Sequence, residues 1–209
     1  MISLLKTYLS KKLSQELPGK LAHIEVAPSR RIEFDKEELL NARECGVLIL
    51  FYIKQDELHL VLMQRPNYEG AHSGQVSFPG GKREASDKDI IHTALREANE
   101  EVGVVMDDVD VVGRLSDVYI PVSNFNVSPI VGFVNYHPQF VIDAREVEEL
   151  IELKLSDLTD VRELTTSKIT LPNKTVIKAP SFNFNDKVIW GATALMLNEL
   201  RWVLKEFNY

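Results

Sequence analysis

The stretch from Gly80 to Val104 reads GGKREASDKDIIHTALREANEEVGV, a glycine pair followed by a segment that ends in several acids. Apolar side chains recur in it at helical spacing, at Ile91, Ala94, Leu95, Ala98 and Val102. Ser86 and Asp89 form a capping pattern that predicts a helix start near Ser86. Gly103 suits the left-handed end of a helix. We therefore expect one helix whose apolar side docks on a sheet.

Three acids of this segment, Glu97, Glu100 and Glu101, share one region of the predicted helix, because residues three and four apart are neighbours. They adjoin the apolar side, and Arg96 can pair with Glu100 one turn later. Gly81 stands at the start of the same unit and exposes a backbone carbonyl. Mg²⁺ and Mn²⁺ prefer such oxygen ligands and bring phosphate oxygens with them. The segment predicts a divalent-cation site for diphosphate chemistry, with a solvated acidic surface as the alternative.

The flanking sequence predicts an α/β architecture. The apolar run from Val47 to Ile53 is typical of a strand covered on both faces, and Leu58 to Gln64 pairs with it as a hairpin. The last segment, from Ala192 to Phe207, has the pattern of an amphipathic helix.

The N-terminal segment repeats leucine at every fourth position, at Leu5, Leu9, Leu13 and Leu17. It has no arginine and no cleavage-site pattern, so a packed amphipathic helix, ended by Pro18 and Gly19, is expected instead of a targeting signal. We expect a helical extension over residues 1–44 that packs on a domain over residues 45–209.

The composition and net charge of the chain argue against several classes of function. Lys plus Arg is 24 and Asp plus Glu is 31 among 209 residues, a net charge of −7, which disfavours a broad surface for nucleic acid or anionic membrane. The single cysteine, Cys45, excludes an internal disulfide and a thiolate zinc cluster, and its apolar surroundings predict a buried inert thiol. No apolar run reaches the roughly 18–20 residues of a membrane span. We expect a cytoplasmic protein.

The segment from Arg96 to Val104, REANEEVGV, resembles the second half of the Nudix box, whose usual form is G-x5-E-x7-R-E-U-x-E-E-x-G-U with U aliphatic. Every position matches, with Ala98 as the smallest acceptable aliphatic residue. The resemblance implies an α/β/α sandwich with a mixed β-sheet, an N-terminal helical extension and a C-terminal helix.

The first half of the box departs from that form. Counting back from Arg96 places the glycine position on Lys82 and the acid position on Lys88. Taking Gly81 as the glycine implies one inserted residue, with Asp87 or Glu84 as the first acid.

A box with this inserted residue resembles that of the coenzyme A pyrophosphatase branch of the superfamily. That branch also carries an upstream pattern, L-L-T-x-R-S-x3-R-x3-G-x3-F-P-G-G. The matching positions are Leu62, Arg65, Gly74, Phe78, Pro79, Gly80 and Gly81. Pro66 replaces the serine and Gly70 replaces the second arginine. Further segments resemble that branch: residues 72–78, 93–97, 121–129 and 189–194. The resemblance covers roughly residues 45–205.

By this resemblance Glu97, Glu100 and Glu101 would hold the metal, with a backbone oxygen of Gly81. Glu97 is also a candidate base, and Arg96 would orient Glu100. A further carboxylate would come from a later loop, with Glu146 first and Glu148 and Glu149 as other candidates, or this loop is only an exposed acidic turn.

The substrate-binding residues implied are Arg65, Lys82, His72 and Phe125. Arg65 would hold a phosphate, or alternatively form a salt bridge at the end of a strand. Lys82 would assist it unless it is only a solvated loop charge. His72 would contact substrate or be hydrogen-bonded within its loop, and Phe125 would line the nucleotide pocket or belong to the core.

The implied activity is a Mg²⁺- or Mn²⁺-dependent cleavage of coenzyme A or acyl-CoA to 3′,5′-ADP and (acyl-)phosphopantetheine. The missing second arginine keeps ADP-ribose, NADH or another dinucleotide open as substrate. A non-catalytic nucleotide sensor is the alternative of a different class. The expected partner is a small nucleotide diphosphate, and a homodimer is left open.

Overall fold

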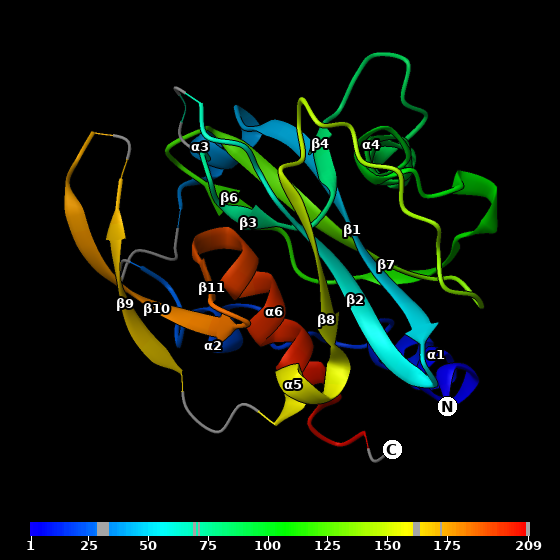
Figure 1. Ribbon diagram of the computed structural model, residues 1–209. Helices are drawn as coiled ribbons and strands as arrows, with labels where there is room; N and C mark the ends of the chain where they lie inside the picture. Colours follow the sequence, from blue (N-terminus) through cyan, green and yellow to red (C-terminus); the bar gives the residue numbers. More distant parts are fainter. Residues whose placement is uncertain (29–33, 69, 71, 161–163, 172, 208–209) are drawn as a thin grey trace.

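Two β-sheets and the helices around them make up the part of the chain that the computed structural model describes, residues 1–28, 34–68, 70, 72–160, 164–171 and 173–207 (Figure 1). The strands are β1 (Arg43–Lys54), β2 (Glu57–Gln64), β3 (Val76–Ser77), β4 (Gly80–Lys82), β5 (Asp110–Arg114), β6 (Val118–Ile120), β7 (Phe125–Phe133), β8 (Glu149–Lys154), β9 (Thr165–Thr170), β10 (Val176–Phe184) and β11 (Lys187–Trp190). The helices are α1 (Ile2–Lys12), α2 (Lys20–His23), α3 (Lys36–Leu40), α4 (Ile90–Val102), α5 (Leu155–Thr159) and α6 (Gly191–Leu204), with a 3₁₀ turn at Met106–Asp108.

The large sheet is mixed. Its order is β3-β2-β1-β7-β5, and β4, β6 and β8 pair with β1, β7 and β2. β1 and β7 are parallel, whereas β2 and β4 run antiparallel to β1. The expected hairpin of β1 and β2 is confirmed.

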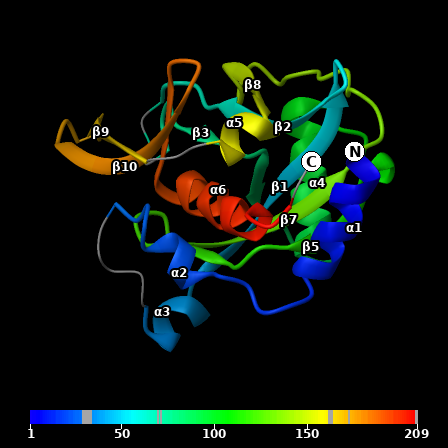
Figure 2. The same ribbon diagram turned by 90° about the horizontal axis from the view of Figure 1, so that it is seen from below.

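The centre of this sheet is covered on both faces, which explains the continuous apolar run of β1. Successive side chains of a strand point to opposite faces, so Ile49 and Phe51 join one core while Leu48 and Leu50 join the other. Figure 2 shows β1 and β7 between α6 on one side and α4 on the other. The expected sandwich of helices around a mixed sheet is confirmed.

Helix α4 begins later than predicted. Its N-cap is Asp89, whose carboxylate accepts a hydrogen bond from the first turn, so the predicted start near Ser86 is wrong. The apolar side is also corrected at one position: Ile91 is 38% exposed, and Ile90 packs against the core instead. Gly103 has φ +75° and ends the helix in the left-handed conformation, as predicted.

The N-terminal helix packs on the sandwich. Leu5 and Leu9 are fully buried, and the Tyr8 hydroxyl donates to the Val203 carbonyl of α6 at 2.8 Å. The helix ends at Lys12, before the Pro18-Gly19 end that was predicted. Residues 29–33 of the expected extension lie outside the described residues.

A buried carboxylate joins this N-terminal part to the sandwich. Glu199 of α6 has no exposed surface and accepts hydrogen bonds from the Gly19 amide at 3.0 Å and the Ser116 hydroxyl at 2.6 Å. His23 Nε2 lies 3.1 Å from it. Burial alone would raise the pKa of Glu199, but hydrogen bonds from His23 and Ser116 lower it below the ordinary value. The ionised form is therefore the one that this packing stabilises.

The second sheet, β9-β10-β11, extends from one side of the molecule (Figure 1). β10 runs through Pro180 in register with β9, although proline cannot donate a backbone hydrogen bond to the ladder. β11 was not predicted. It follows a tight turn in which Asn185 and Asp186 both have positive φ, the geometry of a two-residue hairpin.

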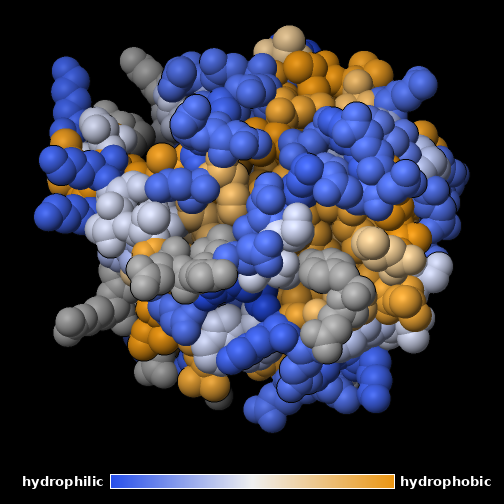
Figure 3. All heavy atoms as spheres, turned by 60° about the horizontal axis from the view of Figure 1, so that its bottom comes forward, coloured by the Kyte–Doolittle hydropathy of each residue, from blue (hydrophilic) through white to orange (hydrophobic). Residues whose placement is uncertain are grey.

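Some large apolar side chains are exposed at the surface. Figure 3 shows orange groups between hydrophilic ones on the face that it presents. The most exposed large apolar residues include Leu4 at 70% and Leu40 at 84%. In the described part of the chain, every helix is too short or too polar to cross a bilayer.

Candidate active site

Glu101 connects α4 to two strands of the large sheet. Its side chain is buried, with a residue exposure of 1%, and its Oε2 accepts a hydrogen bond from the Gly80 amide at 2.7 Å. Its Oε1 accepts a longer one, 3.4 Å, from Arg65 at the end of β2. The glycine pair thus supplies an N–H donor to the acid, a contact that the sequence did not indicate.

Glu97 lies directly against the second glycine of that pair. A Cβ built on Gly81 would stand 2.4 Å from Glu97 Oε2, closer than any side chain can come. Any other residue here would therefore displace the carboxylate, which approaches the backbone of β4. Glu97 Oε1 is also 3.0 Å from Arg96 NH1, so the predicted ligand is held between a strand and an arginine.

Arg96 organises the rest of the helix end. Its NH1 donates to Glu100 at 2.9 Å, as expected from their spacing, and Glu100 keeps 57% of its side chain exposed. Its Nε donates to Asp87 at 2.9 Å. Of the two acids considered for the inserted segment, Asp87 binds this arginine, and the Glu84 amide donates to Asp87 at 2.9 Å. Hydrogen bonds, first from Arg96, hold the pKa of Asp87 well below its usual range.

The later acidic loop contributes one carboxylate near Arg65. Glu146 Oε2 lies 4.0 Å from Arg65 NH2, with half of its side chain exposed. The other two candidates serve different contacts: the Glu148 amide donates to the Gln64 carbonyl, and Glu149 pairs with Lys187. Arg65 therefore lies between Glu101 and Glu146 and forms the salt bridge that was considered for it. Its binding of a phosphate stays a prediction.

Two of the predicted substrate residues lie in the loops around these acids. Lys82 is exposed, and its backbone carbonyl accepts from Arg96 NH2 at 3.3 Å. His72 is partly buried, with Nδ1 3.3 Å from Gln75 Oε1, which is the hydrogen-bonded loop histidine considered above. The roles of Lys82 and His72 in substrate binding stay predictions.

The third, Phe125, lies on the opposite side of the sheet from α4. It packs against the core that faces α6, and the Arg43 guanidinium stands 4.2 Å from its ring centroid. The surroundings of Phe125 are therefore those of a core residue. A role of Phe125 in lining a nucleotide pocket stays a prediction.

The electrostatics of the cluster favour a bound cation. Burial raises the pKa of Glu101 to about 8; Arg65 and the Gly80 amide oppose this, while the negative charges of Glu97 and Glu146 add to it. Burial likewise raises the pKa of Glu97. A divalent cation beside these groups would stabilise their ionised forms.

The neighbouring thiol is inert. Burial, followed by the negative charges of Glu97 and Glu101, raises the pKa of Cys45 to about 12. The prediction of a buried structural cysteine is confirmed.

The donor set fits Mg²⁺ or Mn²⁺ in chemistry. It consists of oxygen ligands, and the contact of Glu97 with Gly81 leaves no side chain between the carboxylate and the backbone. Within the described residues, no three His, Cys, Asp or Glu side chains already form a metal cage. Their charges are instead offset by Arg65 and Arg96.

Comparison with known proteins identifies the family. The model of the NUDIX domain matches residues 43–180. The chain belongs to the Nudix family. A Nudix hydrolase named NudL from Yersinia pestis (strain Pestoides F), described as uncharacterised, is 34% identical over 161 residues, covering 76% of this chain and 78% of the relative. A NudL of Yersinia pseudotuberculosis (serotype O:1b, strain IP 31758) matches to the same extent.

Solved structures of Nudix proteins share the fold. The Nudix hydrolase RenU of M. smegmatis superposes with a TM-score of 0.55 at 17% identity, over 80% of this chain and 89% of that one. A MutT/nudix family protein from Enterococcus faecalis gives 0.55 at 16% identity, over 98% and 71%. Nudix hydrolases generally depend on a divalent metal, which agrees with the oxygen-rich cluster found here.

Proposed function

We propose that this Nudix protein is a divalent-metal-dependent pyrophosphohydrolase that cleaves coenzyme A or acyl-CoA to 3′,5′-ADP and (acyl-)phosphopantetheine. The observation that carries the proposal is the meeting of Glu97, Glu101 and Arg65 beside the glycine pair of β4. This arrangement places carboxylates for a cation next to a guanidinium for a phosphate.

Each residue of the site has its own role in the proposed reaction. Glu97, Glu100 and Glu101, with a backbone oxygen of Gly81, would hold Mg²⁺ or Mn²⁺, which when bound neutralises the diphosphate and acidifies water. Arg65 would orient a phosphate group. Glu97 is the first candidate to accept the proton of the attacking water, and Glu146 at the exposed rim is the second. Arg96 holds the orientation of Glu97 and Glu100.

Coenzyme A is preferred as substrate because of the segment that builds the site. The residues similar to the coenzyme A pyrophosphatase branch form the end of β2, the loop after it, and strands β3 and β4. Gly70, where that branch has a second arginine, is the observation that favours the second candidate, hydrolysis of ADP-ribose, NADH or another dinucleotide.

The substrate test incubates purified protein with coenzyme A, ADP-ribose and NADH, with Mg²⁺, Mn²⁺ or EDTA, and separates the products. We expect 3′,5′-ADP from coenzyme A only when metal is present. Turnover of ADP-ribose alone would reject the coenzyme A assignment. Saturable binding without turnover of any diphosphate would instead support the non-catalytic sensor.

The metal test compares two variants. Glu97→Gln should lower kcat on the order of 100-fold, because it removes an anionic ligand, and it should weaken Mn²⁺ binding in calorimetry. Glu148→Gln is the matched control, since its side chain is exposed and it contacts Gln64 through its backbone. Equal Mn²⁺ affinity in both variants would contradict the metal role of Glu97.

A further inference from the structure

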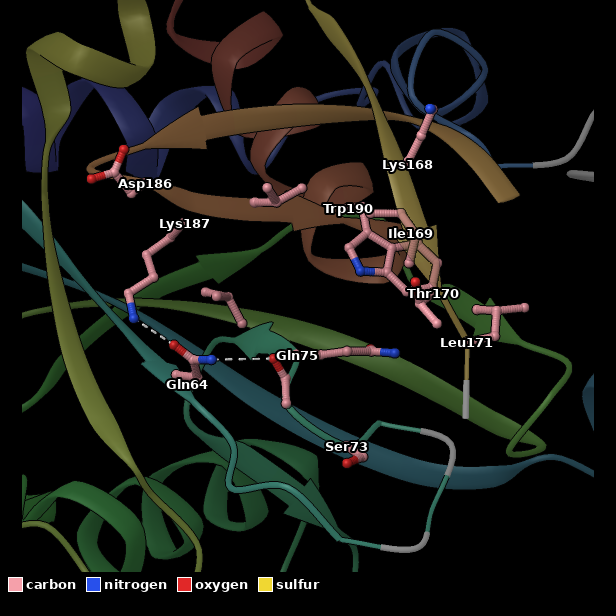
Figure 4. Close-up of a pocket in the computed structure, with 13 residues that line it drawn as sticks. Gln64, Ser73, Gln75, Lys168, Ile169, Thr170, Leu171, Asp186, Lys187 and Trp190 are labelled. Carbon is pink, nitrogen blue, oxygen red and sulfur yellow. Dashed lines mark hydrogen bonds between the residues drawn. The ribbon is translucent and has the colours of Figure 1, made fainter. Parts of the chain in front are cut away.

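A cavity lies at the end of β2, where Gln64 precedes Arg65 in the chain. It has a volume of about 370 Å³ and is bounded by the end of β2, the loop before β3, and the small sheet. Figure 4 shows Trp190, Ile169 and Thr170 along one wall, with Gln64 and Lys187 on the other side. The cavity therefore joins the strands of the large sheet to β9 and β11, which neither the metal nor the phosphate assignment uses.

Adjacent residues of β2 connect this cavity to the carboxylates. Leu60 and Leu62 face the core on the α6 side, whereas Val61 and Met63 face the core on the α4 side. Since side chains alternate along a strand, Gln64 continues toward the α6 side and the cavity. The next residue, Arg65, turns toward α4 and Glu101. A ligand with its diphosphate at Arg65 thus needs to pass only the end of β2 to reach the cavity.

The Trp190 ring presents an available aromatic face in this cavity. The side chain is only partly buried, and no aromatic pair among the described residues includes it. Its indole N–H likewise makes no hydrogen bond to another described residue. A tryptophan that anchors a core normally has its ring packed and its N–H bonded.

The polar groups that line the cavity include hydroxyls and amides as well as the charged side chains of Lys168, Asp186 and Lys187. The Lys187 ammonium is held by Gln64 Oε1 at 2.6 Å and by Glu149 at 2.5 Å. Ser73 Oγ accepts from the Tyr68 amide at 2.9 Å, so its own proton can be donated to a ligand. The hydroxyl and amide groups among them suit a planar, hydrogen-bonding ring.

We propose that this cavity binds the nucleobase of the diphosphate substrate, stacked on Trp190 with its edge near the hydroxyls of Ser73 and Thr170. The proposal rests on the proposed function, because it assumes a nucleotide whose diphosphate lies at Arg65. It assigns the base to the α6 side of the sheet and the scissile group to the α4 side.

The chain offers a direct optical test, because it contains two tryptophans, Trp190 and Trp202. Trp202→Phe leaves Trp190 as the sole indole fluorophore. This variant, in EDTA, is excited at the red edge of indole absorption and titrated separately with 3′,5′-ADP and with phosphopantetheine. We expect saturable quenching by 3′,5′-ADP and none by phosphopantetheine. Quenching by phosphopantetheine alone, or by neither compound, would overturn the proposal.

The same protein separates failure of this proposal from failure of the proposed function. Metal-dependent cleavage of coenzyme A by Trp202→Phe without quenching would reject only the base site. Quenching without cleavage of any diphosphate would reject the hydrolase and keep the base site.

A kinetic comparison adds a second readout. Trp190→Ala should raise KM for coenzyme A by about tenfold with little change in kcat, since stacking on an aromatic side chain contributes to binding of the base. Trp190→Phe should restore most of the affinity because it keeps a ring. Equal KM values for the Ala and Phe variants would contradict stacking.

Discussion

Arg96 and Asp87 form a two-point ion pair: Arg96 Nε donates to Asp87 Oδ1 at 2.9 Å, and Arg96 NH2 donates to Oδ2 at 3.0 Å. The third nitrogen, NH1, reaches Glu97 at 3.0 Å and Glu100 at 2.9 Å. A guanidinium fixed by a bidentate carboxylate has little freedom left. Asp87 in the loop before α4 therefore fixes the position of two predicted metal ligands that it does not touch.

Removing the charge of Asp87 should affect both folding and catalysis. Asp87→Asn leaves the largely buried Arg96 without its bidentate partner, so we expect the free energy of unfolding to fall by about 3 kcal/mol. In the protein that remains folded, kcat should fall more than KM rises, because Glu97 and Glu100 lose their fixed neighbour.

The matched control is Asp89→Asn, two residues along the same loop. Asparagine caps a helix about as well as aspartate, so this variant should behave almost as the wild type in urea denaturation and in assays. Equal effects of the two substitutions would show that Asp87 has no special role.

The free energy of unfolding should depend on pH through the same residue, Asp87. Because the pKa of Asp87 is lowered in the folded state, its stabilising contribution is complete above the ordinary pKa of 3.8. As pH falls below that value, the unfolded chain takes up the proton first and the contribution is lost. Urea denaturation between pH 7 and pH 3 should therefore show a steeper loss for the wild type than for Asp87→Asn. Parallel curves would contradict the ion pair's contribution.

Gly81→Ala should damage the site while preserving the fold. The added Cβ would stand 2.4 Å from Glu97 Oε2, so the carboxylate must move. We expect kcat to fall on the order of 10- to 100-fold, since a small displacement of a catalytic group has large effects. Thermal denaturation should change little if only the side chain of Glu97 moves. Wild-type activity would show that Glu97 is not needed in this position.

The N-terminal helix should contribute to the stability of the whole protein. Leu9→Ala removes a fully buried side chain and should lower the free energy of unfolding by about 2–5 kcal/mol. Leu4→Ala is the control on the same helix, because Leu4 is 70% exposed, and it should change stability by less than about 0.5 kcal/mol. Similar results for both would contradict packing of residues 1–44 as an integral extension.

Local patterns predicted much of the scaffold. The hairpin of β1 and β2, the apolar side of α4 at Ala94 and Ala98, and the end of α4 at Gly103 all follow from short-range periodicity or from one backbone conformation. β6 and β11 were missed because each is only a few residues long and is defined by its pairing partner.

For the acids of the site, too, the sequence determined some features and left others open. The sequence by itself determined that Glu97, Glu100 and Glu101 share one end of a helix, because i, i+3 and i+4 geometry is local. The sequence left the first acid of the box open between Asp87 and Glu84, and only the path of the loop before α4 places Asp87 on Arg96.

Only the tertiary structure decided what surrounds those acids. The burial of Glu101 against the Gly80 amide requires α4 to pack on β4, and its contact with Arg65 requires β2 to end at the same place. Trp190 meets Gln64 across a cavity because β11 folds back beside β3. These contacts join residues 21 to more than 100 positions apart. They depend on the packing of whole strands and helices, which no local pattern records.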